Sequence, residues 1–143
     1  MKYVALVFTF FFVCFNSFSQ PKTDNKAITK EIKPKITVYY FHGTRRCAGC
    51  MGAEKSTVSA LNELYKDKLD KGIIKYTALN LEEAQNKALV EKYQIGWSTL
   101  LFIKDNNGKE EKVDLTQDAF SYGRSNPEKL KQIIKTTVDN MLK

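Results

Sequence analysis

Residues 35–41, Lys-Ile-Thr-Val-Tyr-Tyr-Phe, are mostly β-branched or aromatic, and this pattern predicts a strand. From residue 47 or 48 to about residue 69, apolar side chains recur at the spacing of one helix face. This spacing predicts a long amphipathic helix, which Gly72 is expected to end. The apolar positions of this helix are Val58, Leu61, Leu64, Tyr65 and Leu69.

Two further strands are predicted at residues 73–79 and 99–103, with a helix over residues 81–93 between them. The run Thr-Leu-Leu-Phe-Ile at 99–103 is apolar without alternation, which predicts a central strand buried on both faces. The segment 105–108, Asp-Asn-Asn-Gly, predicts a tight turn because Asn-Gly readily adopts positive φ angles. This turn leads into a fourth strand at 110–115.

A last helix is predicted to begin at residues 125–128, Ser-Asn-Pro-Glu, which form a capping box with proline inside the first turn. Its apolar positions are Leu130, Ile133, Ile134, Val138 and Leu142. The preceding connection contains Asp114, Asp118, Tyr122 and Arg124, which a solvated loop or a partner surface explains equally well.

The resulting order is β-α-β-α-β-β-α, which predicts an α/β domain with a four-stranded mixed sheet flanked by helices on both faces. The two βαβ crossovers are expected to be right-handed, and the closing hairpin is expected to make the sheet mixed. Several α/β folds share this order.

The first nineteen residues have the pattern of a signal peptide. Lys2 precedes an apolar run over residues 3–15, which is short for a membrane span, and small residues occupy positions 17 and 19. We therefore predict cleavage between Ser19 and Gln20 and a periplasmic or secreted protein. An uncleaved N-terminal anchor is the alternative.

Residues 20–34 are polar and rich in lysine, with a proline near each end, which predicts a flexible linker. Residues 35–143 are then long enough for one domain with a core and too short for two. The formal net charge is +7, but the basic residues are spread along the chain rather than clustered. This distribution favours a solvated surface over a nucleic-acid-binding surface, and no motif has the spacing of a nucleic-acid-binding module.

The cysteines indicate a chemistry. Cys47 and Cys50 form a CxxC motif at the predicted turn from strand to helix. Unpaired backbone N–H groups and the helix dipole stabilise a thiolate at a helix start, and Arg45 and Arg46 add positive charge. Such surroundings lower a thiol pKa from about 8.5 to between about 3.5 and 7.5. We expect Cys47 to be the nucleophile and Cys50 the resolving thiol of thiol–disulfide exchange.

Export would leave Cys47 and Cys50 as the only cysteines, because Cys14 lies in the predicted signal peptide. Disulfides persist in exported proteins. A disulfide across so short a loop would contribute little to stability, so a purely structural role is the weaker interpretation.

Together the motif and the element order resemble the thioredoxin fold over residues 35–143. Residues 93–103, Tyr-Gln-Ile-Gly-Trp-Ser-Thr-Leu-Leu-Phe-Ile, are also similar to the stretch that leads into the third core strand of that family. The resemblance implies that Cys47 is the attacking cysteine and Cys50 the resolving one.

The sequence departs from the family pattern at three places. Ser98 precedes Thr99 where the family usually has a cis-proline before threonine, so the edge that receives substrate is altered. Phe41 stands where thioredoxins place a buried carboxylate, and Glu54 is a poor substitute. Arg46 replaces the usual tryptophan. These departures suggest an exported thioredoxin-like protein with a narrower substrate range.

Two other side chains belong to the candidate site. His42 is the only histidine and is expected to form a hydrogen bond at the strand end, with a direct part in the chemistry as the alternative. Trp97 is either packed against the dithiol or an ordinary aromatic of the core or rim.

The expected function is therefore an exported thiol–disulfide oxidoreductase that acts as a reductase, with the Cys47–Cys50 disulfide as its redox group and no other cofactor. Its expected partners are extracytoplasmic protein thiols and disulfides and a membrane electron donor, and it is expected to be a monomer that binds no nucleic acid. A copper(I)-binding accessory protein, which would use Cys47, Cys50, His42 and Met51, and a non-enzymatic adaptor are the alternatives.

Overall fold

The structure, a computed structural model, describes residues 33–143. The expected signal peptide and nearly all of the expected linker lie outside these residues. The described part contains one four-stranded sheet with the order β2-β1-β3-β4. Its strands are β1 (Ile36–His42), β2 (Ile74–Asn80), β3 (Thr99–Asn106) and β4 (Lys109–Asp114).

Strands β1 and β2 are parallel, whereas β3 runs antiparallel to both of its neighbours, β1 and β4. The predicted mixed sheet is confirmed, but the prediction of two βαβ crossovers is wrong. Within residues 33–143, only β1 and β2 form a parallel pair joined by a helix. The connection after β2 starts at Asn80, which pairs with His42, and ends at Thr99, which pairs with Phe41. It therefore returns to the same end of the sheet, and β3 must run in the opposite direction.

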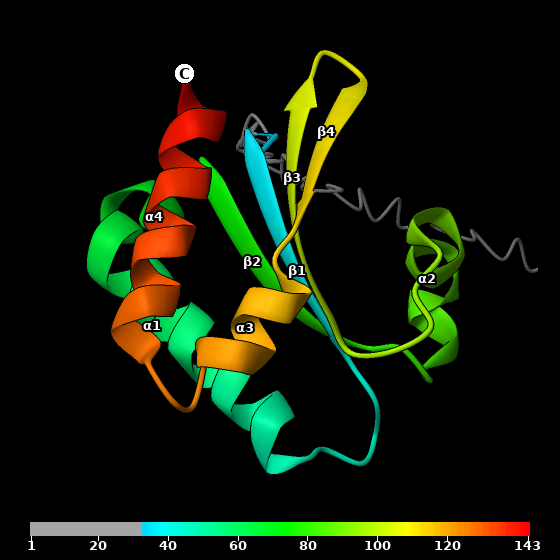
Figure 1. The fold of residues 1–143 in the computed structure, drawn as a ribbon. Helices are drawn as coiled ribbons and strands as arrows, with labels where there is room; N and C mark the ends of the chain where they lie inside the picture. The colour runs from blue at the N-terminus through cyan, green and yellow to red at the C-terminus, as the bar shows by residue number, and fades with distance from the viewer. Residues whose placement is uncertain (1–32) are drawn as a thin grey trace, which may run out of the picture. The chain divides into compact units, whose positions relative to one another are not determined.

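Helices cover both faces of the sheet (Figure 1). One face packs against α1 (Ala48–Asp70), α3 (Thr116–Tyr122) and α4 (Pro127–Leu142). The other face packs against the segment that contains η1 (Ala84–Asn86) and α2 (Lys87–Tyr93). Within residues 33–143, no helix has the length and apolar character needed to cross a membrane.

The two faces of β3 contribute to two separate cores. Leu100 and Phe102 join the larger core with the α1, α3 and α4 side chains, while Leu101 and Ile103 join the smaller one beside α2. This arrangement confirms the prediction of a central strand buried on both faces. The largest fully buried side chains of the larger core are Tyr40, Phe102, Ile36, Leu61, Ile74, Leu100, Leu130 and Ile134.

The predicted hairpin turn is confirmed. Asn107 and Gly108 have φ angles of 55° and 93°, and Asn106 pairs directly with Lys109. Asp105 stabilises the turn because its Oδ1 accepts a hydrogen bond from the Gly108 N–H at 2.7 Å. The Asn-Gly pair supplies the positive φ angles that a two-residue hairpin loop requires.

Three predicted boundaries were wrong. The expected loop before the last helix contains α3, a helix of seven residues that is too short to show a clear periodicity. The expected helix over 81–93 begins only at Ala84, because Glu82 and Glu83 form a turn against Asn80. Finally, Asn126 rather than Ser125 caps α4, and its side chain accepts from the Lys129 N–H, so no capping box forms.

Candidate active site

Cys47 and Cys50 are joined by a disulfide at the start of α1, with their Cα atoms 5.1 Å apart. Cys47 is the N-cap residue, and its Sγ accepts a hydrogen bond from the Cys50 backbone N–H at 3.0 Å. Cys47 is exposed, whereas the Cys50 residue is only 8% exposed to solvent. The predicted position of the motif at a strand-to-helix turn is confirmed, and Cys47 is the more accessible of the two cysteines.

The first turn of α1 is suited to a negative charge on Cys47 Sγ. The early N–H groups of a helix have no intrahelical acceptor and carry the positive end of the dipole. The first turn of α1 contains no acidic residue that could compete for them. When the disulfide opens, the N–H group that now points at Cys47 Sγ is in place to stabilise a thiolate there.

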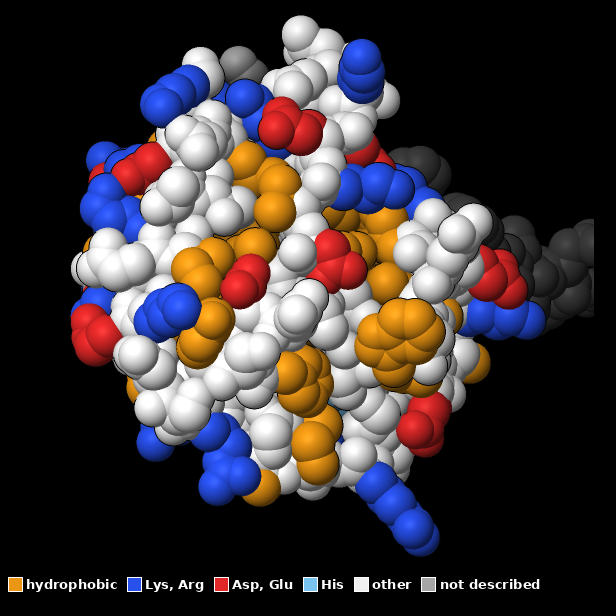
Figure 2. Space-filling view, in the orientation of Figure 1, with side chains coloured by type: hydrophobic (Ala, Val, Ile, Leu, Met, Phe, Trp, Pro, Cys, Tyr) orange, Lys and Arg blue, Asp and Glu red, His pale blue; other side chains and the backbone are white. Residues whose placement is uncertain are grey.

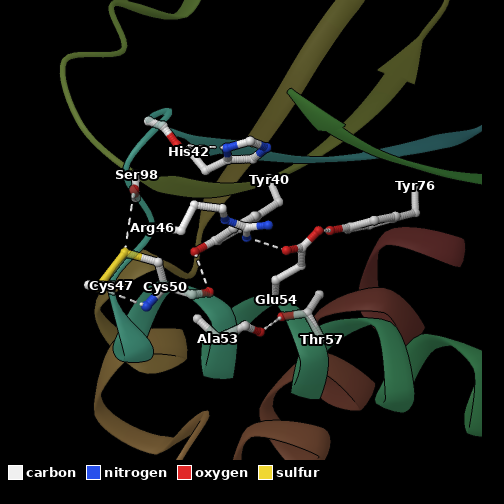
Figure 3. A network of polar contacts seen from close by, with 11 residues as sticks. Tyr40, His42, Arg46, Cys47, Cys50, Ala53, Glu54, Thr57, Tyr76 and Ser98 are labelled. Carbon is white, nitrogen blue, oxygen red and sulfur yellow. Dashed lines mark hydrogen bonds and ion pairs between the residues drawn. A yellow bond between two sulfur atoms is a disulfide. The ribbon is translucent and has the colours of Figure 1, made fainter. Parts of the chain in front are cut away.

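A polar cluster lies beside this turn, between α1 and the sheet (Figure 3). We call it the Tyr40 cluster, and it consists of Tyr40, Arg46, Glu54 and Tyr76. The Tyr40 hydroxyl donates to the Cys50 carbonyl at 2.8 Å, and the Tyr76 hydroxyl donates to Glu54 Oε1 at 3.2 Å. Arg46 forms an ion pair with Glu54, and its guanidinium lies 5.9 Å from the centre of the Tyr40 ring.

From the sequence, both Arg45 and Arg46 were expected to add positive charge beside Cys47, and the Tyr40 cluster changes this expectation for Arg46. Burial alone would lower the pKa of Arg46, but the hydrogen bond and charge of Glu54 outweigh it and raise that pKa. Burial raises the pKa of Tyr40 and Tyr76, with Glu54 adding to both. The positive charge of Arg46 is therefore largely balanced by Glu54. Arg45 remains exposed at the surface.

The loop before β3 faces the buried sulfur. Ser98 Oγ lies 3.9 Å from Cys50 Sγ, and the side chain points to it from across the motif (Figure 3). Thr99 Oγ1 donates to the Trp97 carbonyl at 2.9 Å, which holds the loop in shape. No peptide bond within residues 33–143 is cis, so Ser98 follows Trp97 through a trans bond.

A groove of about 400 Å³ opens beside the disulfide. Its lining residues are Cys50, Trp97, Ser98, Thr116, Gln117 and Phe120. Trp97 is 72% exposed, and Phe120 and Met51 are also exposed at the surface. Figure 2 shows hydrophobic side chains at the surface over α3 and over the loop before β3. A larger hollow of about 790 Å³ lies between α1 and β2, and no cysteine lines it.

Helix α3 reaches the disulfide because glycines allow a close approach to α1. A Cβ atom on Gly123 would lie 2.7 Å from the Ala53 Cα, and one on Gly52 would overlap the Arg124 side chain. Ser56 Oγ donates to the Gly123 carbonyl at 2.6 Å. A Cβ on Gly49 would lie 3.6 Å from the Phe120 ring.

Some of the residues that the sequence predicted for the site do not contact the sulfur atoms of Cys47 and Cys50. The structure brings Cys50, Ser98 and Trp97 together in the groove, while Thr99 is buried behind it. His42 contacts the Gly43 carbonyl through Nδ1 at 3.0 Å, and its ring lies beside Tyr40 (Figure 3).

Metal binding was an alternative from the sequence. Within residues 33–143, no group of three or more His, Cys, Asp or Glu side chains is arranged to hold a metal ion. Copper(I) binding by the reduced Cys47 and Cys50 stays a prediction, which titration with copper(I) against a competing chelator would test.

Sequence reasoning missed two members of the site. Tyr40 could have been found from the alternation in residues 36–40, which places it on the same face as Ile36 and Val38 and beneath the following helix. Phe120 could not, because its position depends on α3 packing against α1.

The sheet order, the helices on both faces and the place of the disulfide at the start of α1 together define the architecture. The protein has a thioredoxin-like fold. No protein-family model matches the chain, and no curated protein sequence matches it. Among solved structures, a thioredoxin from Thermus thermophilus is similar, with 18% identity and a TM-score of 0.44 over 73% of this chain and 75% of that one. A malarial protein is also similar, with 16% identity and a TM-score of 0.40 over 61% of this chain and 93% of the other.

Proposed function

We propose that this protein is an exported thiol–disulfide oxidoreductase that reduces disulfides in other extracytoplasmic proteins. The fold and the CxxC disulfide support thiol–disulfide chemistry in general. The observation that carries the proposal is the position of Cys47 Sγ, which is exposed at the helix start and accepts the Cys50 N–H. A thiolate with these neighbours is both stabilised and accessible.

The proposed reaction begins with the reduced protein. The Cys47 thiolate attacks one sulfur of a substrate disulfide, forms a mixed disulfide and releases the first substrate thiolate. The Cys50 thiolate then attacks Cys47 Sγ, which forms the Cys47–Cys50 bond and breaks the bond to the substrate. The substrate gains two electrons and two protons, and the protein is left oxidised.

The Tyr40 cluster favours the reducing direction. A dithiol whose reduced form is strongly stabilised is an oxidant, because stabilisation of the thiolate opposes disulfide formation. Here Glu54 balances the charge of Arg46, so one of the two adjacent cations contributes less to the Cys47 thiolate. A less stabilised thiolate makes the dithiol a better reductant.

The location and partners are part of the same proposal. The signal-peptide pattern of residues 1–19 supports export to the periplasm or the exterior, where substrate disulfides occur. The oxidised protein would need a donor of two electrons, for which a membrane electron carrier is suitable. We propose that it acts as a monomer.

Insulin reduction with dithiothreitol tests the activity. Cys47→Ser should abolish turnover because no attacking sulfur remains, and Cys50→Ser should accumulate the mixed disulfide on Cys47. Cys14→Ser provides the matched control and should retain full turnover. Wild-type turnover in the Cys47→Ser variant would exclude the proposed mechanism. The equilibrium with glutathione gives the reduction potential, which decides between reductase and oxidase.

A further inference from the structure

The second step of the proposed reaction requires a thiolate at a buried position. Cys50 Sγ must carry negative charge when it attacks Cys47 Sγ, yet Cys50 is only 8% exposed. Burial disfavours the charged form of a thiol. The Cys50 backbone N–H points at Cys47 Sγ and not at its own sulfur. A hydrogen-bond donor close to Cys50 Sγ would offset this cost of burial.

Ser98 supplies a hydroxyl at this place. Within residues 33–143, it is the one side chain with a polar oxygen or nitrogen in hydrogen-bonding contact with Cys50 Sγ, at 3.9 Å. Its hydroxyl has no other hydrogen-bond partner among those residues. The Tyr40 hydroxyl, by contrast, donates to the Cys50 carbonyl rather than to the sulfur.

The chain directly after Ser98 is held by the sheet and by α3. Thr99 pairs with Phe41 in the sheet, and its hydroxyl donates to the Trp97 carbonyl. The next residue, Leu100, donates its N–H to Thr116 Oγ1 at 2.9 Å, which ties the strand to the start of α3. Ser98 is thus presented to Cys50 by a fixed backbone.

The groove gives this contact a route to solvent. Cys50 and Ser98 both line it, together with residues of α3 and Trp97. A proton that leaves the Cys50 thiol can therefore reach water without crossing the core.

We propose that Ser98 is a catalytic residue whose hydroxyl donates a hydrogen bond to the Cys50 thiolate during resolution of the mixed disulfide. This inference rests on the proposed function. The Cys50 proton leaves to water through the groove, and Ser98 keeps its own proton. The Cys50–Cys47 bond then forms as the Cys47–substrate bond breaks, and the released substrate thiolate takes a proton from solvent.

The test isolates Cys50 as a single thiol. The full chain carries Cys14→Ser and Cys47→Ser, and the rate at which iodoacetamide alkylates Cys50 is measured as a function of pH. Each rate is divided by the plateau rate at high pH, and the pH at which this ratio is one half is the midpoint. Ser98→Ala should move the midpoint upward by about one pH unit, which is about a tenfold lower rate below both midpoints. Ser98→Thr keeps the hydroxyl and should restore the midpoint.

Thr136→Ala provides the matched control, because it removes an exposed hydroxyl from α4 away from the disulfide. Its midpoint should equal that of the parent chain. An unchanged midpoint in Ser98→Ala would overturn the proposal. So would an equal shift in the Ser98→Thr variant, because the shift would then come from altered packing rather than from the lost hydroxyl. Thermal melting of each variant verifies that it is folded.

This experiment uses no disulfide substrate, so its outcome is separate from that of the insulin assay. A protein that fails to reduce insulin but shows the Ser98-dependent midpoint would exclude the proposed activity and retain the proposed contact. A protein that reduces insulin but shows no Ser98-dependent midpoint would retain the proposed activity and exclude the proposed contact.

Discussion

At the scale of single residues, the site consists of two sulfurs in different surroundings. Cys47 Sγ is exposed and has a backbone donor, whereas Cys50 Sγ is buried and faces the hydroxyl of Ser98. Arg46 keeps its positive charge, but Glu54 pairs with it. We therefore expect the reactivity of the motif to depend on Glu54 as well as on the cysteines.

Glu54→Gln tests this dependence. The variant keeps the shape of the side chain but frees the charge of Arg46, so the Cys47 thiolate should be more stabilised. We expect a less negative reduction potential in glutathione equilibria and faster alkylation of Cys47 at low pH. Stability should fall by about 1 kcal/mol in urea denaturation, since a partly exposed charged hydrogen bond is lost.

Glu63→Gln is the control for Glu54→Gln. Glu63 lies on the exposed side of α1 and pairs with Lys131, and its replacement should leave the reduction potential unchanged. A more negative potential in Glu54→Gln would contradict the role assigned to the ion pair.

At the scale of elements, the contact between α1 and α3 shapes the groove. Gly123 is buried where the chain leaves α3, and its carbonyl accepts from Ser56 of α1. The close approach of the two segments brings Phe120 to Gly49 of the motif. Helix α3 thus forms one wall of the groove beside the disulfide.

Gly123→Ala should disturb this contact. The added Cβ would lie 2.5 Å from the Ala119 carbonyl oxygen and 2.7 Å from the Ala53 Cα, so the backbone must move. We expect a loss of about 2 kcal/mol in urea denaturation, which is typical of overpacking. Gly96→Ala is the matched control, because a Cβ there meets nothing within 4 Å. Equal stability of the two variants would show that the approach of α3 is not tight.

At the scale of the whole described domain, four tyrosines are expected to make the stability of the fold depend on pH in the alkaline range. Burial is the main cause that raises the pKa of Tyr40, Tyr65, Tyr76 and Tyr93 above the ordinary value of 10.0. The native state therefore favours the neutral phenols. Their contribution to stability is complete below about pH 10 and is lost as the pH rises further, because the unfolded chain ionises first.

Phenolate absorbance and circular dichroism, followed together from neutral to strongly alkaline pH, measure this effect. A large part of the phenolate signal should appear only as the chain unfolds. Tyr76→Phe should weaken the loss of stability above pH 10, since one phenol no longer ionises on unfolding. Complete ionisation of all tyrosines before any loss of helix signal would contradict the prediction.

Most of the secondary structure followed from the sequence because it rests on local patterns. The β-branched run of β1, the apolar run of β3 and the Asn-Gly turn each have a local physical cause. Helix α3 and the direction of β3 have no such local cause in the sequence. A helix of seven residues depends on packing for its stability, and a strand's direction depends on where its connection returns.

The sequence by itself determined the α/β order, the hairpin and the place of Cys47 at a helix start. These features depend on side-chain periodicity, turn chemistry and backbone groups within a few residues of each other. Only the tertiary structure decided that Glu54 pairs with Arg46, that Ser98 faces Cys50 and that Phe120 lines the groove. Such contacts join segments distant in the chain, and they form only when the sheet and helices pack together.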